Sequence, residues 1–134
     1  MSLRQLLHWF RQLDAWLVVP AILFVIWGEL THVNVAQMLE IDVWDKALHF
    51  TAYFGLALMT TIAVRARPVL AVWLSFGLIV MGAVLEVVQG MTGRDADIWD
   101  EVANTLGVLT GTAIAWAGIA FLRARKLVED KDAD

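Results

Sequence analysis

The sequence contains no cysteine and only two prolines among its 134 residues. The absence of cysteine excludes disulfide bonds, thiolate metal ligands and thiol nucleophiles. Charged residues are scarce, at 18% of the chain, and the sequence has no internal repeat, low-complexity tract or linker. These absences indicate one domain with short connections, and nothing in the sequence suggests a basic groove for nucleic acid.

Polar residues are also missing from four long stretches, and these stretches predict the fold class. Hydrophobic residues make up 60% of the chain, and the mean hydropathy of +0.67 exceeds that of ordinary soluble domains. A helix of roughly 17–25 apolar residues crosses a hydrocarbon core. We therefore predict an all-α transmembrane four-helix bundle, a single domain over residues 1–134, with spans at about 15–33, 47–64, 69–90 and 102–122.

The N-terminal region leaves two alternatives open. The first apolar stretch is too long for a signal peptide and lacks an A-x-A cleavage site after it, so we expect an anchor. Before this stretch, apolar residues recur at helical spacing, namely Leu3, Leu6, Leu7, Phe10 and Leu13. The spacing predicts either an amphipathic helix lying in the membrane interface or a simple extension of the first span.

Two connections carry clear local signals. Residues 65–68 (RARP) predict a tight turn with the proline at the first position of a helix, which makes the second and third spans an antiparallel hairpin. After the third span, Gly90 and Gly93 interrupt the helix, and Asp95 or Asp97 can cap the next one.

Basic residues predict the orientation in the membrane. With four spans, only Lys46 and Arg94 lie on one side, whereas all other lysines and arginines lie on the opposite side. Because such residues mark the cytoplasmic side, both termini are expected in the cytoplasm.

Polar residues form four short clusters at the ends of the apolar stretches, and the predicted topology brings them to one membrane face. We predict that this face carries a ligand-binding site composed of Asp45, Lys46, His49, Tyr53, Glu86, Gln89, Arg94, Asp97, Asp100 and Asn104.

The first cluster lies on one face of the second span, because Asp45, His49 and Tyr53 are spaced four residues apart. Asp45 is a candidate for holding His49 in one tautomer, as a base or a metal ligand requires. A buried packing histidine is the alternative. For Lys46, the alternative is a side chain that extends to water or lipid phosphate.

Glu86 lies about one turn inside the outer end of the third span. A charged side chain at such a position usually faces the bundle interior and has a partner. The candidate partners are Arg94, Lys46 and His49. Glu86 is either one half of a structural ion pair or a proton acceptor or ligand in a headgroup pocket.

The fourth span carries a continuous polar and small-residue face. Asp97, Asp100, Asn104, Gly107 and Gly111 follow at steps of three and four residues. The two glycines allow a neighbouring helix to approach closely, so we expect them in helix packing. Asp100 and Asn104 should then point towards that helix.

Together, the segments DKALHFTAYF at 45–54, EVVQ at 86–89, GRDADIWD at 93–100 and NTLG at 104–107 resemble the VanZ-like family. This resemblance covers roughly residues 45–111. It implies a small multi-pass protein of the bacterial inner (plasma) membrane and cell envelope. The founding members are linked to teicoplanin and lipoglycopeptide resistance, an antibiotic resistance that should not be assumed for this chain.

Two functional classes remain open. In the first, the protein binds the headgroup of a phospholipid or lipid-linked cell-wall precursor, with Lys46 and Arg94 facing phosphate. In the second, it is a membrane enzyme acting on a lipid phosphate or ester. The candidate catalytic residues are then His49, Glu86 and Asp100. His49 and Glu86 would serve as acid and base, or Glu86 and Asp100 would instead hold a divalent metal.

The sequence favours binding over catalysis. No serine lies near His49 or Asp100, and no compact metal signature is present. We expect a membrane lipid or lipid-linked precursor as partner, no nucleic acid, no cofactor and no dedicated metal site. A homodimer is left open.

Overall fold

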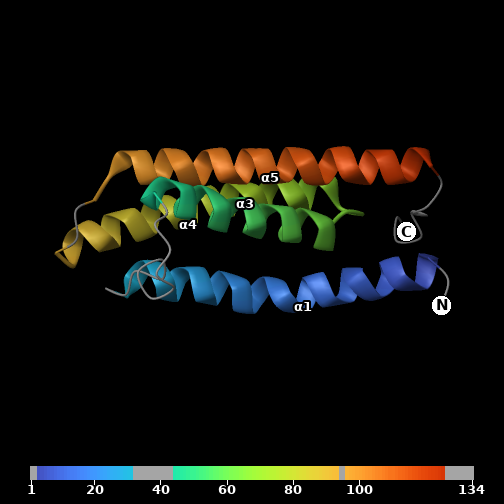
Figure 1. Cartoon of the computed structure of the whole chain (residues 1–134), viewed down its shortest axis with the longest axis horizontal. Coiled ribbons are helices and arrows are strands. Elements are labelled where there is room, and N and C mark those ends of the chain that lie inside the picture. Colours follow the sequence, from blue (N-terminus) through green and yellow to red (C-terminus); the bar gives the residue numbers. More distant parts are fainter. Residues whose placement is uncertain (1–2, 32–43, 94–95, 126–134) are drawn as a thin grey trace.

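The computed structural model describes residues 3–31, 44–93 and 96–125. This part of the chain forms four α-helices and no strand: α1 (Leu3–Leu30), α3 (Asp45–Ala63), α4 (Pro68–Met91) and α5 (Ile98–Ala124) (Figure 1). The all-α four-helix bundle predicted from the sequence is thereby confirmed.

The helices run up and down, so successive ones are antiparallel (Figure 1). The contact between α3 and α5 is the most extensive, and α1 packs on α3 and α4. One end of the bundle therefore combines the last turn of α1, the first turn of α3, the last turn of α4 and the first turn of α5. We call it the site end; it lies on the left in Figure 1.

Each predicted span lies largely within one helix. Residues 3–13 continue directly into the first span, because α1 is a single 28-residue helix with Pro20 in its interior. Of the two alternatives for the N-terminal region, the structure has the continuous helix.

Both predicted connections are present. Pro68 occupies the first turn of α4, directly after the short turn that follows α3. Asp97 is the N-cap of α5, and its carboxylate accepts a hydrogen bond from the backbone N–H of Trp99 at 2.9 Å. Gly93 has a φ of +86°, a left-handed conformation that glycine adopts at little cost.

The seam between α3 and α5 is made by glycine. A Cβ atom at Gly107 would collide with the backbone carbonyl of Phe50, and one at Gly111 with that of Phe54. Only hydrogen at these positions lets the two backbones approach so closely. The seam leads directly into Asn104 and Asp100, which are both buried.

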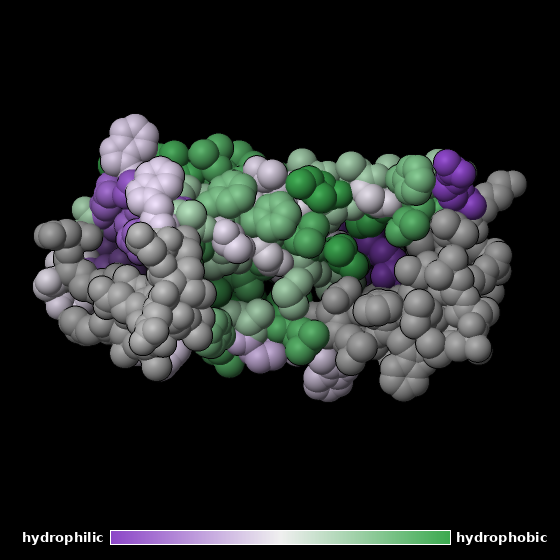
Figure 2. All heavy atoms as spheres, viewed as in Figure 1, coloured by the Kyte–Doolittle hydropathy of each residue, from purple (hydrophilic) through white to green (hydrophobic). Residues whose placement is uncertain are grey.

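The outer surface is apolar over much of its length. Figure 2 shows hydrophobic side chains covering the middle of one face, with polar ones near its two ends. On α4 the exposed residues include Val69, Trp73, Phe76, Val80 and Val87. Patches of this extent are rare on soluble monomers but suit contact with lipid.

Two helices, α4 and α5, are long and apolar enough to cross a membrane, and the apolar part of α1 (Trp16–Leu30) is shorter.

Candidate functional site

Charge is distributed unevenly between the two ends of the bundle. From Trp16 onwards, every acidic residue that the structure describes lies at the site end: Glu29, Asp45, Glu86, Asp97, Asp100 and Glu101. From the same residue onwards, the described arginines lie at the opposite end: Arg65, Arg67, Arg123 and Arg125. Lys46 is the one lysine or arginine among the described residues of the site end.

Lys46 is held by two carboxylates of α5. Its Nζ donates to Asp97 Oδ2 at 2.5 Å and to Asp100 Oδ1 at 2.9 Å. The hydrogen bond with Asp97, followed by that with Asp100, raises the pKa of Lys46 above its ordinary value. The same contact with Lys46 lowers the pKa of Asp97. The ammonium group is therefore engaged within the protein, in contrast to the alternative in which it extends to water or lipid phosphate.

His49 is oriented by Asn104. His49 is buried, and its Nδ1 lies 3.1 Å from Asn104 Oδ1. The Asn104 amide donates to Glu101 Oε2 at 3.3 Å, which assigns the carboxamide oxygen to the side facing His49. His49 Nδ1 therefore donates, and Nε2 carries the lone pair when the ring is neutral.

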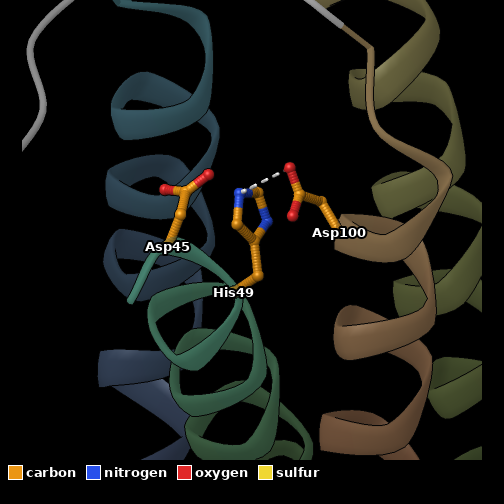
Figure 3. Close-up of side chains that lie close together, drawn as sticks. All are labelled: Asp45, His49 and Asp100. Atoms are coloured by element: carbon orange, nitrogen blue, oxygen red, sulfur yellow. Dashed lines mark ion pairs between the residues drawn. The ribbon is translucent and has the colours of Figure 1, made fainter. Parts of the chain in front are cut away.

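The prediction that Asp45 would hold His49 in one tautomer is wrong as to the partner. Asn104, and not Asp45, makes the hydrogen bond that fixes the tautomer. Asp45 instead lies beside the ring, while Asp100 lies on its other side (Figure 3). His49 Nε2 is 3.9 Å from Asp100 Oδ2.

Glu86 also has a different partner from those expected. It is buried, and its Oε1 accepts a hydrogen bond from the backbone N–H of Asp97 at 2.5 Å. Its hydrogen bond therefore goes to the connection before α5, and not to Lys46 or His49. Arg94, the third expected partner, lies outside the described residues. The helix turn containing Glu86 is thus tied to the start of α5.

Of the remaining predicted residues, Gln89 joins two helices and Tyr53 lies deeper in the bundle. Gln89 is buried, and its Nε2 donates to the backbone carbonyl of Glu29 at 2.8 Å, which joins α4 to α1. Tyr53 is completely buried in the hydrophobic core with Leu56, Ala57, Leu78 and Val108. Tyr53 therefore supports the site from below and faces no open space.

Glu29 also lies at the site end, although it is not among the residues predicted from the sequence. Its side chain is 11% exposed, and its Oε1 lies 3.9 Å from His49 Nδ1. The sequence does contain a signal for this residue. Glu29 is a single carboxylate inside an apolar stretch, as is Glu86, which was predicted as a site residue on that ground. The apolar length of the first stretch predicts an anchor and does not by itself mark Glu29 as a site residue.

Glu101 and Gly82 were missed as well. Glu101 accepts from Asn104 and from Thr105. A Cβ at Gly82 would stand 2.6 Å from Glu101 Oε2 and 3.0 Å from Asn104 Nδ2. Gly82 of α4 therefore makes room for the pair that orients His49. The spacing within one helix does not reveal such a contact between two helices.

The family model described as VanZ/LLP1 matches residues 3–122. The chain belongs to the VanZ/LLP1 family. The match extends the resemblance seen at residues 45–111 to all four helices, including α1. Membership and the apolar helices identify a membrane protein, consistent with the cell envelope. No curated protein and no solved structure matched the chain.

In this VanZ/LLP1 protein, the segments that carry the resemblance converge at the site end. They supply the start of α3, the end of α4 and the start of α5, which contribute Lys46, His49, Glu86, Asp97 and Asp100. Among the described residues, no serine, threonine or tyrosine hydroxyl is hydrogen-bonded to His49. The geometry offers a base and several carboxylates but no activated nucleophile.

Proposed function

We propose that the protein binds the headgroup of a phospholipid or lipid-linked cell-wall precursor at its site end. We call the binding group the acidic cluster, and it consists of Glu29, Asp45, Lys46, His49, Glu86, Gln89, Asp97, Asp100, Glu101 and Asn104. One observation carries the proposal: four helices each bring polar side chains, several of them buried, to the same end of an otherwise apolar bundle.

The cost of such an arrangement supports a functional role. A buried carboxylate near hydrocarbon is unfavourable unless it is paired. Glu29, Glu86 and Asp100 are all at most 11% exposed by side chain or residue. The single described ammonium group, that of Lys46, bonds to Asp97 and Asp100 only. The described part of the acidic cluster therefore has an excess of negative charge.

This excess indicates the chemistry of the ligand. Carboxylates, an amide and an imidazole bind amines, hydroxyl groups or metal-bridged phosphates. Direct recognition of phosphate by Lys46 would require it to leave its two carboxylate partners. A headgroup with an amine or several hydroxyl groups, or a phosphate reached through a cation, fits the acidic cluster best.

Native mass spectrometry of the purified protein tests the proposal. We expect a co-purifying lipid in the wild type and its loss in folded His49→Ala and Glu86→Gln. The control is Thr61→Val, which alters a buried hydroxyl of α3 that has no hydrogen-bond partner among the described residues. Thr61 lies about 18 Å along the helix from His49. Equal lipid occupancy in the wild type and both cluster variants would contradict the proposal.

A link to glycopeptide resistance is the finer proposal that family membership suggests. A protein that holds a cell-wall lipid could shield it, deliver it or help move it across the membrane. We expect expression of the wild type, but not of Glu86→Gln at equal abundance, to raise the inhibitory concentration of teicoplanin in a susceptible bacterium. An unchanged inhibitory concentration would separate this chain from the founding members.

The alternative of a membrane enzyme rests on His49. One ring nitrogen is fixed by Asn104 and the other is free to accept a proton, as a general base requires. Incubation of the purified protein with a lipid extract, followed by mass spectrometry of the lipids, separates the two functions. A headgroup-binding protein leaves the lipids unchanged, whereas an enzyme produces a new species that His49→Ala does not.

A further inference from the structure

We infer that Asp45, His49 and Asp100 form a binding site for one divalent transition-metal ion, with Zn²⁺ the best-fitting ion. Each residue offers one ligand atom, and these three atoms lie within 4.8 Å of one another. Figure 3 shows the His49 ring between the two carboxylates. Asp45 and His49 come from successive turns of α3, and Asp100 comes from the first turn of α5.

When its ring is neutral, His49 has a free lone pair on Nε2. The residue is 8% exposed, and its Nδ1 is used by Asn104. Among the described residues, no hydrogen bond reaches Nε2, and Asp100 Oδ2 lies 3.9 Å from it. Both Nε2 and the oxygen opposite it are acceptors, so a cation between them would satisfy the two together.

The two carboxylate oxygens of Asp100 have different surroundings. This residue is 6% exposed, and its Oδ1 accepts from Lys46. Its Oδ2 has no hydrogen bond among the described residues and faces His49. Lys46 therefore fixes the carboxylate without occupying the oxygen that would bind the ion. The hydrogen bonds from Lys46 to Asp100 and from His49 to Asn104 would orient the two ligands, as hydrogen bonds to metal ligands usually do.

The ligand set determines the class of ion. Imidazole nitrogen favours zinc and its neighbours in the first transition row, whereas Ca²⁺ and Mg²⁺ favour oxygen alone. Two carboxylates and one histidine would leave a fourth tetrahedral position open. Zinc ligands stand about 3.4 Å apart in a tetrahedron with bonds of about 2.1 Å. The 3.9 Å between His49 Nε2 and Asp100 Oδ2 needs only a small adjustment, and the exposed Asp45 side chain can rotate into place.

The open fourth coordination position links the ion to the proposed headgroup binding. Only this link rests on the proposed function. A bound divalent cation would offset part of the excess negative charge of the acidic cluster. A phosphate oxygen of a headgroup could then occupy the fourth position, although the surrounding side chains are acidic. The metal site itself requires no lipid.

The test uses the full chain in detergent. The protein is stripped with a chelator and titrated with ZnCl₂ alone by calorimetry, and bound zinc is counted by elemental analysis. We expect one zinc per chain and a rise in Tm on zinc addition. Asp45→Asn and His49→Ala should weaken binding at least about tenfold. Asp45 is exposed, so Asp45→Asn remains informative if His49→Ala fails to fold.

The matched control is Asp95→Asn. It removes one negative charge from the connection before α5, and Asp95 is not part of the acidic cluster. Zinc affinity should change by less than about threefold if the three ligands hold the ion. Equal losses in Asp95→Asn and Asp45→Asn would show diffuse attraction of cations and would overturn the site. The absence of saturable zinc binding in the wild type would do the same.

The two proposals fail separately. Zinc binding without any co-purifying lipid would overturn the headgroup function and leave the metal site standing. A bound lipid that survives chelation, in a protein without zinc affinity, would overturn the metal site only.

Discussion

Lys46 in the first turn of α3 and Asp97, the N-cap of α5, form an ion pair between residues 51 positions apart. Through Lys46, the starts of two parallel helices are joined at the site end. The same ammonium group bonds to Asp100, so one lysine positions both the cap of α5 and a buried carboxylate beside His49.

This arrangement predicts unequal effects of removing the two partners. Lys46→Gln should lower Tm more than Asp97→Asn, because it leaves both Asp97 and the buried Asp100 without their cation. Asp97→Asn keeps the cap and leaves Lys46 paired with Asp100. Thermal unfolding of both variants in one detergent provides the comparison. A larger drop in Tm for Asp97→Asn would mean that capping dominates over the ion pair.

The glycine seam predicts a clear contrast along α5. Gly107→Ala should destabilise the bundle by about 1–3 kcal/mol, because the new Cβ meets the carbonyl oxygen of Phe50, part of a backbone that cannot rotate away. Gly111→Ala should behave in the same way against Phe54.

The matched control for the seam is Gly118→Ala. No atom lies within 4 Å of a Cβ at Gly118, and alanine favours helix over glycine. Its Tm should therefore be unchanged or slightly raised. If all three variants keep the wild-type Tm, the helices are farther apart than the structure places them.

Much of the architecture could be read from the sequence, because it depends on patterns within single segments. The length of the apolar stretches predicts the helices, Pro68 indicates the turn before α4, and Asp97 indicates the cap of α5. The small-residue face of α5 also follows from spacing on one helix, and the structure places it against α3.

The partners of the polar groups could not be read in this way. Spacing places Asp45 and His49 on one face of α3, but Asn104 reaches the ring because α3 and α5 touch at Gly107. Glu86 bonds to a backbone N–H, a donor that every residue but proline carries and that no motif marks. Choices between helices depend on rotations about their axes, which the sequence pattern leaves open.

Topology remains a prediction that fusions can test. The described arginines lie at the end opposite the acidic cluster, and such residues favour the cytoplasmic side. Reporters inserted at Arg67 and at the C-terminus should therefore read as cytoplasmic, and one at Gly93 as extracytoplasmic. A cytoplasmic reading at Gly93 would reverse the orientation and place the acidic cluster inside the cell.

Two substitutions of Glu86 separate the effect of its charge from the effect of its hydrogen bond. Glu86→Gln removes the charge but keeps an oxygen that accepts from the Asp97 N–H. Glu86→Ala removes both, so the part-buried Asp97 N–H loses its acceptor at a cost of about 1 kcal/mol. We expect Glu86→Gln to keep its Tm and lose bound lipid, and Glu86→Ala to lose both, as measured on the same purified samples.

If the acidic cluster had a purely structural role, the variants of Glu86 would differ in stability and not in lipid binding alone. If Glu86 acted as one half of an ion pair with Arg94, Glu86→Gln and Arg94→Gln would each lower Tm or abundance. Combining them would then recover part of the loss, because the double variant leaves no unpaired charge. A stable Glu86→Gln protein that still binds lipid would exclude the charge of Glu86 from headgroup recognition, and its role would be to hold the start of α5 through the Asp97 N–H.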